Sequence, residues 1–328
     1  MVAALSAVVF SAGFVDSAPA LAGWLDAGHR ISAAVFPATA ERRVKRSIRY
    51  DHPGSIWSSG GILRRGAPEA EVIYQGLNSD TAPIEEMVRR LQPDLIISSH
   101  WMRRLSGRLL SLARLGGVNV HPALLPYYRG PDPLNGMIMA GDLRKAGGVT
   151  LHQMTERFDE GPIIAQIPLR ECHWTDSLQM RRALGSAQYQ LVRNDLHRWL
   201  SGTITTCRQT GGNWHDKSVR SSRIEATWPA ERLLPISRLL LQNSRRLRAL
   251  STPTGPIPLP QVLRVIGPPT GAPIATGRKW LEFDCKDARI RATARRRISI
   301  ALERQRIKRT LRRSLPLEGL ESSTDAGP

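Results

Sequence analysis

The sequence predicts an α/β protein: a doubly wound, mostly parallel sheet followed by a small, basic domain that contains strands. Apolar stretches alternate with amphipathic ones over residues 1–205, as expected for parallel strands that helices cover on both faces. The 328 residues, of which 41% are hydrophobic, are enough for about two domains. Beyond residue 205 the alternation stops, and Pro, Gly and basic residues become frequent.

The first 23 residues, MVAALSAVVFSAGFVDSAPALAG, allow two interpretations. The apolar run and the A-x-A-like end resemble a secretory signal, but no Lys or Arg precedes the run, as a signal requires. We therefore expect a buried strand at Ala4–Phe10 and a helix at Ala18–Ala27 that ends at Gly28.

The same strand and helix pattern continues through the first 205 residues. Further strands are predicted at 31–36, 72–74, 93–99, 148–154 and 161–169 and around Asn119 and His121, and further helices at 81–92, 106–116 and 176–202. We expect residues 1–205 to form one catalytic domain of a Rossmann-like, doubly wound type.

The second half of the chain is predicted to be less regular. Residues 206–235 read as a linker and 236–313 as a small basic domain, with a helix at 236–250 and a hairpin formed by RKWLEFDC and ARIRAT. Residues 314–328 have the composition of a disordered tail.

Charge and cysteine content restrict the partners and the compartment. The net charge of +19 favours an anionic partner, and residues 286–313 alone hold twelve basic and two acidic residues. That stretch is either a solvated helix face or tail, or a surface for RNA. Three widely spaced cysteines, without metal-ligand spacing, are typical of a reducing compartment, so we expect a cytoplasmic protein without a membrane span.

The stretch GGVNVHPALLPYYRG, residues 116–130, carries the strongest chemical signal. Asn119 and His121 alternate with valines, so both point to one face of a short strand that Pro122 ends. Asp159 follows in a loop between two apolar strands, just before a Gly-Pro pair. An amide, an imidazole and a carboxylate at neighbouring strand ends suit acyl transfer to an amine. In that reaction Asn119 and His121 would stabilise an oxyanion and Asp159 would assist His121.

Two segments, NVHPALLPYYRG and GGVTLHQMTERFDEGPIIAQ, resemble the motifs of the 10-formyltetrahydrofolate-dependent formyltransferases. That family shares N-x-H-P-S-L-L-P and, about forty residues later, D-x-G. The resemblance covers roughly residues 5–202 and implies the catalytic residues Asn119, His121 and Asp159, a 10-formyltetrahydrofolate co-substrate and no metal. It implies the following folate contacts: Trp101, Met102, Arg103, Leu105, Ala123, Leu124, Leu125 and Pro126.

The sequence departs from the family pattern at Ala123 and in the first turn. One further histidine, His152, is not assigned a catalytic role. Ala123 stands where the motif has Ser, and the first turn, SAGFVDSAP, lacks the pattern by which glycinamide ribonucleotide enzymes hold a phosphate. This argues against that acceptor. His152 shares a strand face with Thr150 and Met154, and we expect it to pack beneath the site rather than react.

Three alternatives remain for the acceptor. The basic second domain, and the similarity of SRRLRAL to a helix of the methionyl-tRNA formyltransferases, favour initiator methionyl-tRNA. Its phosphates would contact Arg289, Arg291, Arg295, Arg296 and Arg297. A nucleotide amino sugar, whose diphosphate also attracts arginine, is the alternative within the family. A non-catalytic, RNA-binding relative is the third.

Overall fold

The protein is described by a computed structural model. The structure describes residues 3–13, 15–42, 44–45, 58–76, 79–169, 177–215, 223–236, 248–253, 255–259 and 262–293. The predictions for residues 294–328, and for most of the expected helix at 236–250, lie outside the described residues.

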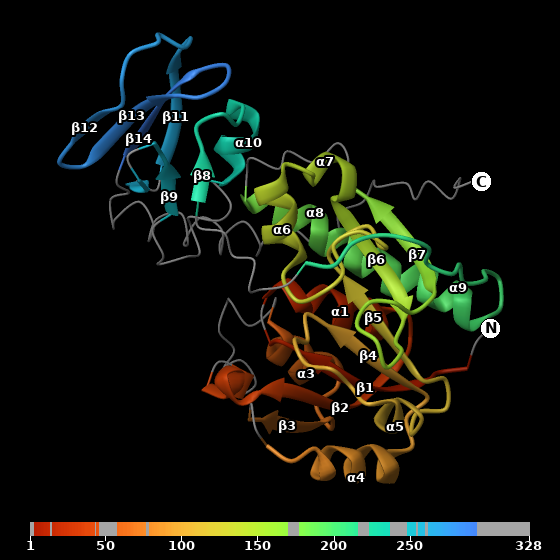
Figure 1. Ribbon diagram of the computed structural model, residues 1–328. Helices are drawn as coiled ribbons and strands as arrows, with labels where there is room; N and C mark the ends of the chain where they lie inside the picture. Colours follow the sequence, from red (N-terminus) through yellow and green to blue (C-terminus); the bar gives the residue numbers. More distant parts are fainter. Residues whose placement is uncertain are drawn as a thin grey trace.

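A seven-stranded sheet forms the larger part of the molecule (Figure 1). Its strands are β1 (Ser6–Ser11), β2 (Arg30–Pro37), β3 (Glu71–Gln75), β4 (Leu95–Ser99), β5 (Gly117–His121), β6 (Gly148–Gln153) and β7 (Ile163–Pro168). The order is β3-β2-β1-β4-β5-β6-β7. The chain proceeds outward from β1 to β3 and then returns to place β4 on the other side of β1. The doubly wound fold is confirmed, and β1 occupies the interior of the sheet as a strand should.

The first five strands are parallel, whereas β6 is antiparallel to both β5 and β7. Because β6 runs the other way, its residues lie directly opposite those of β5, with Asn119 paired with His152 and His121 with Thr150. The sequence predicts both strands but not this direction. The antiparallel pairing decides which side chains meet at the site.

Helices cover both faces of the sheet, and the strands alternate accordingly. The helices are α1 (Ala18–Asp26), α3 (Ser59–Gly66), α4 (Ala82–Leu91), α5 (Gly107–Leu110), α6 (Pro133–Ala140), α7 (Leu143–Ala146), α8 (Ser177–Gln190) and α9 (Leu196–Leu200). On β1, Val9 packs in the cluster that includes α1 and α8, and Val8 packs in the cluster with α4 and α5. Short 3₁₀ turns at Val15–Ser17 and Ala38–Ala40 accompany them.

Two predicted helices differ from the observed ones. The helix expected at 106–116 is reduced to the single turn α5, because the chain must bend back at Gly116 (φ 71°) to enter β5. The helix expected at 176–202 is present as α8 and α9, joined by a π-helical turn at Leu191–Asp195.

The C-terminal part contains two small sheets, which Figure 1 shows beside the large domain. The elements are β8 (Arg223–Glu225), α10 (Ala230–Pro235), β9 (Arg248–Ser251), β10 (Ile257–Leu259), β11 (Val262–Gly267), β12 (Ala275–Gly277), β13 (Trp280–Asp284) and β14 (Arg289–Thr293). The predicted hairpin is confirmed as β13 and β14. In contrast, residues 248–250 form a strand instead of a helix end, and β8 and α10 occupy part of the expected linker. Strand β8 pairs with β9, so the small domain draws on residues before 236.

Candidate active site

The side chains of Asn119 and His152 meet because they face each other across β5 and β6. Residues directly opposite in an antiparallel pair place their side chains about 5 Å apart on one face. The amide nitrogen Nδ2 of Asn119 is 3.2 Å from Nε2 of His152. His121 ends β5 two residues later on the same face, as the alternation predicts.

Asp159 is held in the loop between β6 and β7 by its backbone and its carboxylate. Its φ is +55°, a conformation that Asp tolerates better than most residues. The side chain of Gln209 donates to its carbonyl oxygen at 2.8 Å, and the N–H of Gly130 donates to Oδ2 at 2.8 Å. Gly161 is required nearby, since a Cβ there would lie 1.9 Å from the carbonyl oxygen of Gln153.

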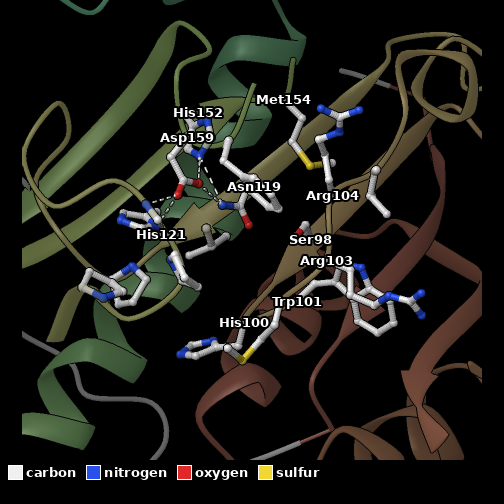
Figure 2. Close-up of a pocket in the computed structure, with 18 of the residues that line it drawn as sticks. Ser98, His100, Trp101, Arg103, Arg104, Asn119, His121, His152, Met154 and Asp159 are labelled. Carbon is white, nitrogen blue, oxygen red and sulfur yellow. Dashed lines mark hydrogen bonds and ion pairs between the residues drawn. The ribbon is translucent and has the colours of Figure 1, made fainter. Parts of the chain in front are cut away.

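The Asp159 carboxylate lies between two imidazoles, as Figure 2 shows. Its Oδ2 is 3.5 Å from Nδ1 of His121, and its Oδ1 is 3.4 Å from Nε2 of His152. Asn119 also donates from Nδ2 to Oδ1, at 3.2 Å. The structure therefore brings together the three predicted residues and adds a fourth, His152, which we expected to pack beneath the site.

Burial and charge act in opposite directions on this cluster. Burial lowers the pKa of His121 below its usual value, although the neighbouring Asp159 raises it in part. Burial raises the pKa of Asp159, but His121, His152 and the N–H of Gly130 outweigh this and keep that pKa well below its usual range. Near neutral pH we therefore expect an ionised Asp159 beside a largely neutral His121.

A cavity of about 950 Å³, including its open mouth, adjoins the cluster. Asn119, His121, His152 and Asp159 line one end of it, which we call the polar end. The loop between β4 and α5 lines the other end, which we call the loop end, with the predicted folate contacts Trp101, Met102, Arg103 and Leu105, and with Arg104.

The L-L-P turn does not line the cavity as predicted. Ala123 is fully buried, and Leu124, Leu125 and Pro126 are likewise absent from the cavity wall. The turn is tied to β6, because Thr150 donates to the carbonyl oxygen of Ala123 at 2.6 Å and accepts from the N–H of Leu125 at 3.0 Å. The turn supports the site from behind, and the lining residue at this point is Pro122.

The segment 207–215, expected to be linker, packs against the site. Cys207 pairs with Ile163 of β7, and Gln209 accepts from the side chain of Arg129 while it donates to Asp159. Asn213 accepts from the N–H of Tyr128 at 2.6 Å. The sequence carries no periodic signal for this segment, because its contacts are isolated bridges and side-chain hydrogen bonds to distant residues.

Two of the five arginines predicted to contact tRNA form ion pairs within the protein. Arg289 is only 8% exposed, and it forms ion pairs with Asp284 at 3.0 Å and Glu282 at 3.7 Å. Arg291 pairs with Glu282. These two residues therefore stabilise the four-stranded sheet, and Arg295, Arg296 and Arg297 lie outside the described residues.

The described part of the chain has neither a metal-binding cluster nor a membrane-spanning helix. There, no three His, Cys, Asp or Glu residues are placed to hold a metal ion. None of the helices in that same part is long and apolar enough to cross a membrane.

Solved structures with a similar fold include two N-formyltransferases and HypX. An N-formyltransferase from Helicobacter canadensis, solved with folinic acid and dTDP-3-aminofucose, is 14% identical with a TM-score of 0.59, over 88% of this chain and 99% of that one. A 4-N formyltransferase from Francisella tularensis is 15% identical with a TM-score of 0.55, over 78% and 97%. HypX from Aquifex aeolicus, in complex with tetrahydrofolic acid, is 16% identical with a TM-score of 0.52, over 87% of this chain but 43% of HypX.

These structural similarities show a shared fold. A match to a sequence family gives separate evidence for part of the chain. Residues 64–192 match the family described as formyl transferase, a range that contains the whole Asn119, His121, His152 and Asp159 cluster. The match identifies this part of the chain as a formyl transferase domain.

Proposed function

We propose that the protein transfers a formyl group from 10-formyltetrahydrofolate to a primary amine. The observation that carries this proposal is the buried Asp159 carboxylate between two imidazoles, at the end of a cavity in a formyl transferase domain. Such a cluster accepts and returns protons without changing the fold, as attack by an amine requires.

The loop end of the cavity fits a reduced folate. The indole N–H of Trp101 is buried and finds no hydrogen-bond acceptor among the described residues, so it can serve a polar ring. Trp101 packs edge-to-face on Phe10, with ring centroids 5.4 Å apart, which fixes the indole as a flat wall. Relatives with this fold were solved with tetrahydrofolic acid and with folinic acid, which supports a folate at this place.

The polar end handles the proton that the reaction moves. When bound, the folate supplies a formyl group whose bond to N10 is exchanged for a bond to the amine. His121 donates from Nε2 to the carbonyl oxygen of Tyr128 at 2.9 Å, so in the neutral ring Nδ1 keeps its lone pair next to Asp159. Nδ1 can take the proton released by the amine, with Asp159 stabilising the cation, and return it to the leaving nitrogen.

A nucleotide-linked amino sugar is the acceptor that we propose. The Helicobacter relative was solved with such a sugar, and this chain matches nearly its whole length. Phe158, at the cavity, and Trp214 are exposed, with ring centroids 6.2 Å apart, and provide a surface for sugar or base rings. The methionyl-tRNA interpretation loses support, because Arg289 and Arg291 are already paired with acidic side chains.

The test is formylation by the purified full chain with 10-formyltetrahydrofolate. dTDP-3-aminofucose and methionyl-tRNA are offered separately, and both tetrahydrofolate release and the mass of the product are measured. We expect formylation of the sugar at a rate that Asp159→Asn reduces by roughly 10²- to 10⁴-fold. Formylation of the tRNA alone would reject the sugar acceptor, and failure with both would reject this proposal.

A further inference from the structure

The hydrogen bonds of His152 fix its tautomer. Its Nδ1 is 2.8 Å from the carbonyl oxygen of Gln153, which can only accept, so Nδ1 carries the hydrogen. In the neutral ring Nε2 then holds a lone pair. In this neutral form Nε2 accepts from Nδ2 of Asn119, 3.2 Å away, and its 3.4 Å contact with Oδ1 of Asp159 is an ion pair only when the ring is protonated.

The second amide hydrogen of Asn119 is donated to Asp159. Nδ2 donates to Oδ1 of Asp159 at 3.2 Å, so both hydrogens of the amide are directed at protein acceptors. Rotating the amide by half a turn would place its oxygen against a carboxylate and a ring lone pair, which repel it. The carbonyl oxygen Oδ1 of Asn119 therefore points away from Asp159, into the cavity on the side of Ser98, as Figure 2 shows.

This arrangement differs from the role that the sequence suggested for Asn119. A donor to an oxyanion needs an N–H that faces the reacting carbonyl group. Here the atom that faces the cavity is an oxygen, and no described residue donates a hydrogen bond to it. An oxygen in this place can hold an N–H, and a neutral primary amine brings two of them.

We propose that His152 is a positioning residue that fixes the Asn119 amide so that Oδ1 accepts an N–H of the attacking amine. Two acceptors, this oxygen and Nδ1 of His121, would hold the two N–H groups and leave the amine lone pair free for the formyl carbon. The inference rests on the proposed amine acceptor, but the orientation of Asn119 is a property of the protein alone and is tested separately.

The orientation is tested without substrate by NMR of the Asn side-chain amide protons. The Asn119→Ala variant identifies the Asn119 signals by their loss. In the wild-type protein we expect these protons to exchange with water slowly and in His152→Leu to exchange at least tenfold faster. Equally fast exchange in both would overturn the proposal, even if no acceptor is ever formylated.

The role in the reaction is tested with dTDP-3-aminofucose or methionyl-tRNA, whichever the wild-type protein formylates. We expect His152→Leu to reduce kcat/KM for the acceptor by roughly 10²-fold, the effect of misplacing a reacting group by about 1 Å. Most of this loss should appear in KM of the acceptor, with KM of the folate unchanged. His152→Gln, whose side-chain oxygen can still accept from Asn119, should recover most of it.

A double-mutant cycle separates positioning from a general structural effect. If His152 acts through Asn119, then His152→Leu should add less than about twofold in the Asn119→Ala background. A full loss in that background, or a loss confined to kcat, would overturn the proposal. His29→Leu is the matched control, because His29 is also buried and accepts one backbone N–H but does not line the cavity. It should leave KM for the acceptor unchanged.

Discussion

The two ends of the cavity are built from different kinds of structure. Asn119, His121 and His152 belong to paired strands, and each of their functional atoms that faces Asp159 lies within 3.5 Å of it. At the loop end, Trp101 and Met102 follow His100, which has a left-handed backbone (φ 57°), and Met102 is 47% exposed. The polar end is therefore rigid and closed, whereas the loop end is open to solvent.

This contrast separates chemistry from binding. Strand residues with several hydrogen bonds hold reacting groups within the narrow tolerance that catalysis needs. A loop with exposed side chains can adjust to a ligand at little cost in free energy. Substitutions at the polar end should therefore change kcat or the KM of the acceptor amine, and substitutions at the loop end should change the affinity for folate.

The largest expected effect is that of Asp159→Asn. Asn removes the negative charge but tolerates the left-handed backbone at this position, so the fold should persist. Loss of a positioned proton acceptor reduces kcat by roughly 10²- to 10⁴-fold. The measurement is tetrahydrofolate release, with thermal unfolding as a check on the fold. Glu160→Gln, an exposed charge in the same loop, is the control and should stay within about twofold of wild type.

A smaller effect is expected on the pH dependence of stability. Burial lowers the pKa of His121 in the folded protein. Between that lowered pKa and the ordinary histidine pKa, the unfolded chain therefore binds a proton at His121 and the folded protein does not. Acidification below about 6.5 should therefore favour unfolding, by at most about 1.4 kcal/mol per pH unit for one histidine. In His121→Gln, denaturant unfolding between pH 7 and 5 should show a flatter decline. His29 and His100, whose pKa values burial also lowers, remain in both proteins, so parallel declines would contradict the assignment to His121.

The strands of the large sheet could be predicted from the sequence, because burial on both faces leaves continuous apolar segments. The Asn119, His121 and Asp159 cluster could also be predicted, since alternation places the first two on one face and the loop position of Asp159 is evident. His152 could not be assigned, because its contact with Asn119 depends on the antiparallel direction of β6. No local pattern in the sequence distinguishes that direction.

The contacts of the segment 207–215 and of the L-L-P turn also could not be predicted from local sequence patterns. Gln209 and Asn213 reach the site through side-chain hydrogen bonds to residues 48 or more positions away, which no periodicity records. The motif at Ala123–Pro126 was recognisable, but its backbone is hydrogen-bonded to Thr150 of β6 and its residues do not line the cavity. A motif identifies where a site is more reliably than which of its atoms touch the ligand.

At the loop end, Trp101→Phe tests the contribution of one unpaired donor. The substitution keeps the aromatic wall on Phe10 and removes the buried indole N–H. If that N–H binds the folate, its loss should raise Kd by about fivefold, corresponding to roughly 1 kcal/mol for one hydrogen bond, with kcat nearly unchanged. Titration with folinic acid gives Kd. Trp280→Phe, an exposed tryptophan on β13, is the control; equal or tighter binding by the Trp101 variant would show that the N–H stays unpaired in the complex.

The smallest effect on binding is expected for Ala123→Ser, which restores the residue typical of the family motif. Ala123 is fully buried behind the cavity wall, so an added hydroxyl cannot reach a ligand in the cavity. The Kd for folinic acid should therefore stay within about twofold of wild type. The extra atom enters a packed region, so the free energy of unfolding should fall by about 1 kcal/mol or more. A change in Kd of fivefold or more in either direction would show that the L-L-P turn is part of the cavity wall when folate is bound, and that the rigid end of the cavity extends farther than the structure indicates.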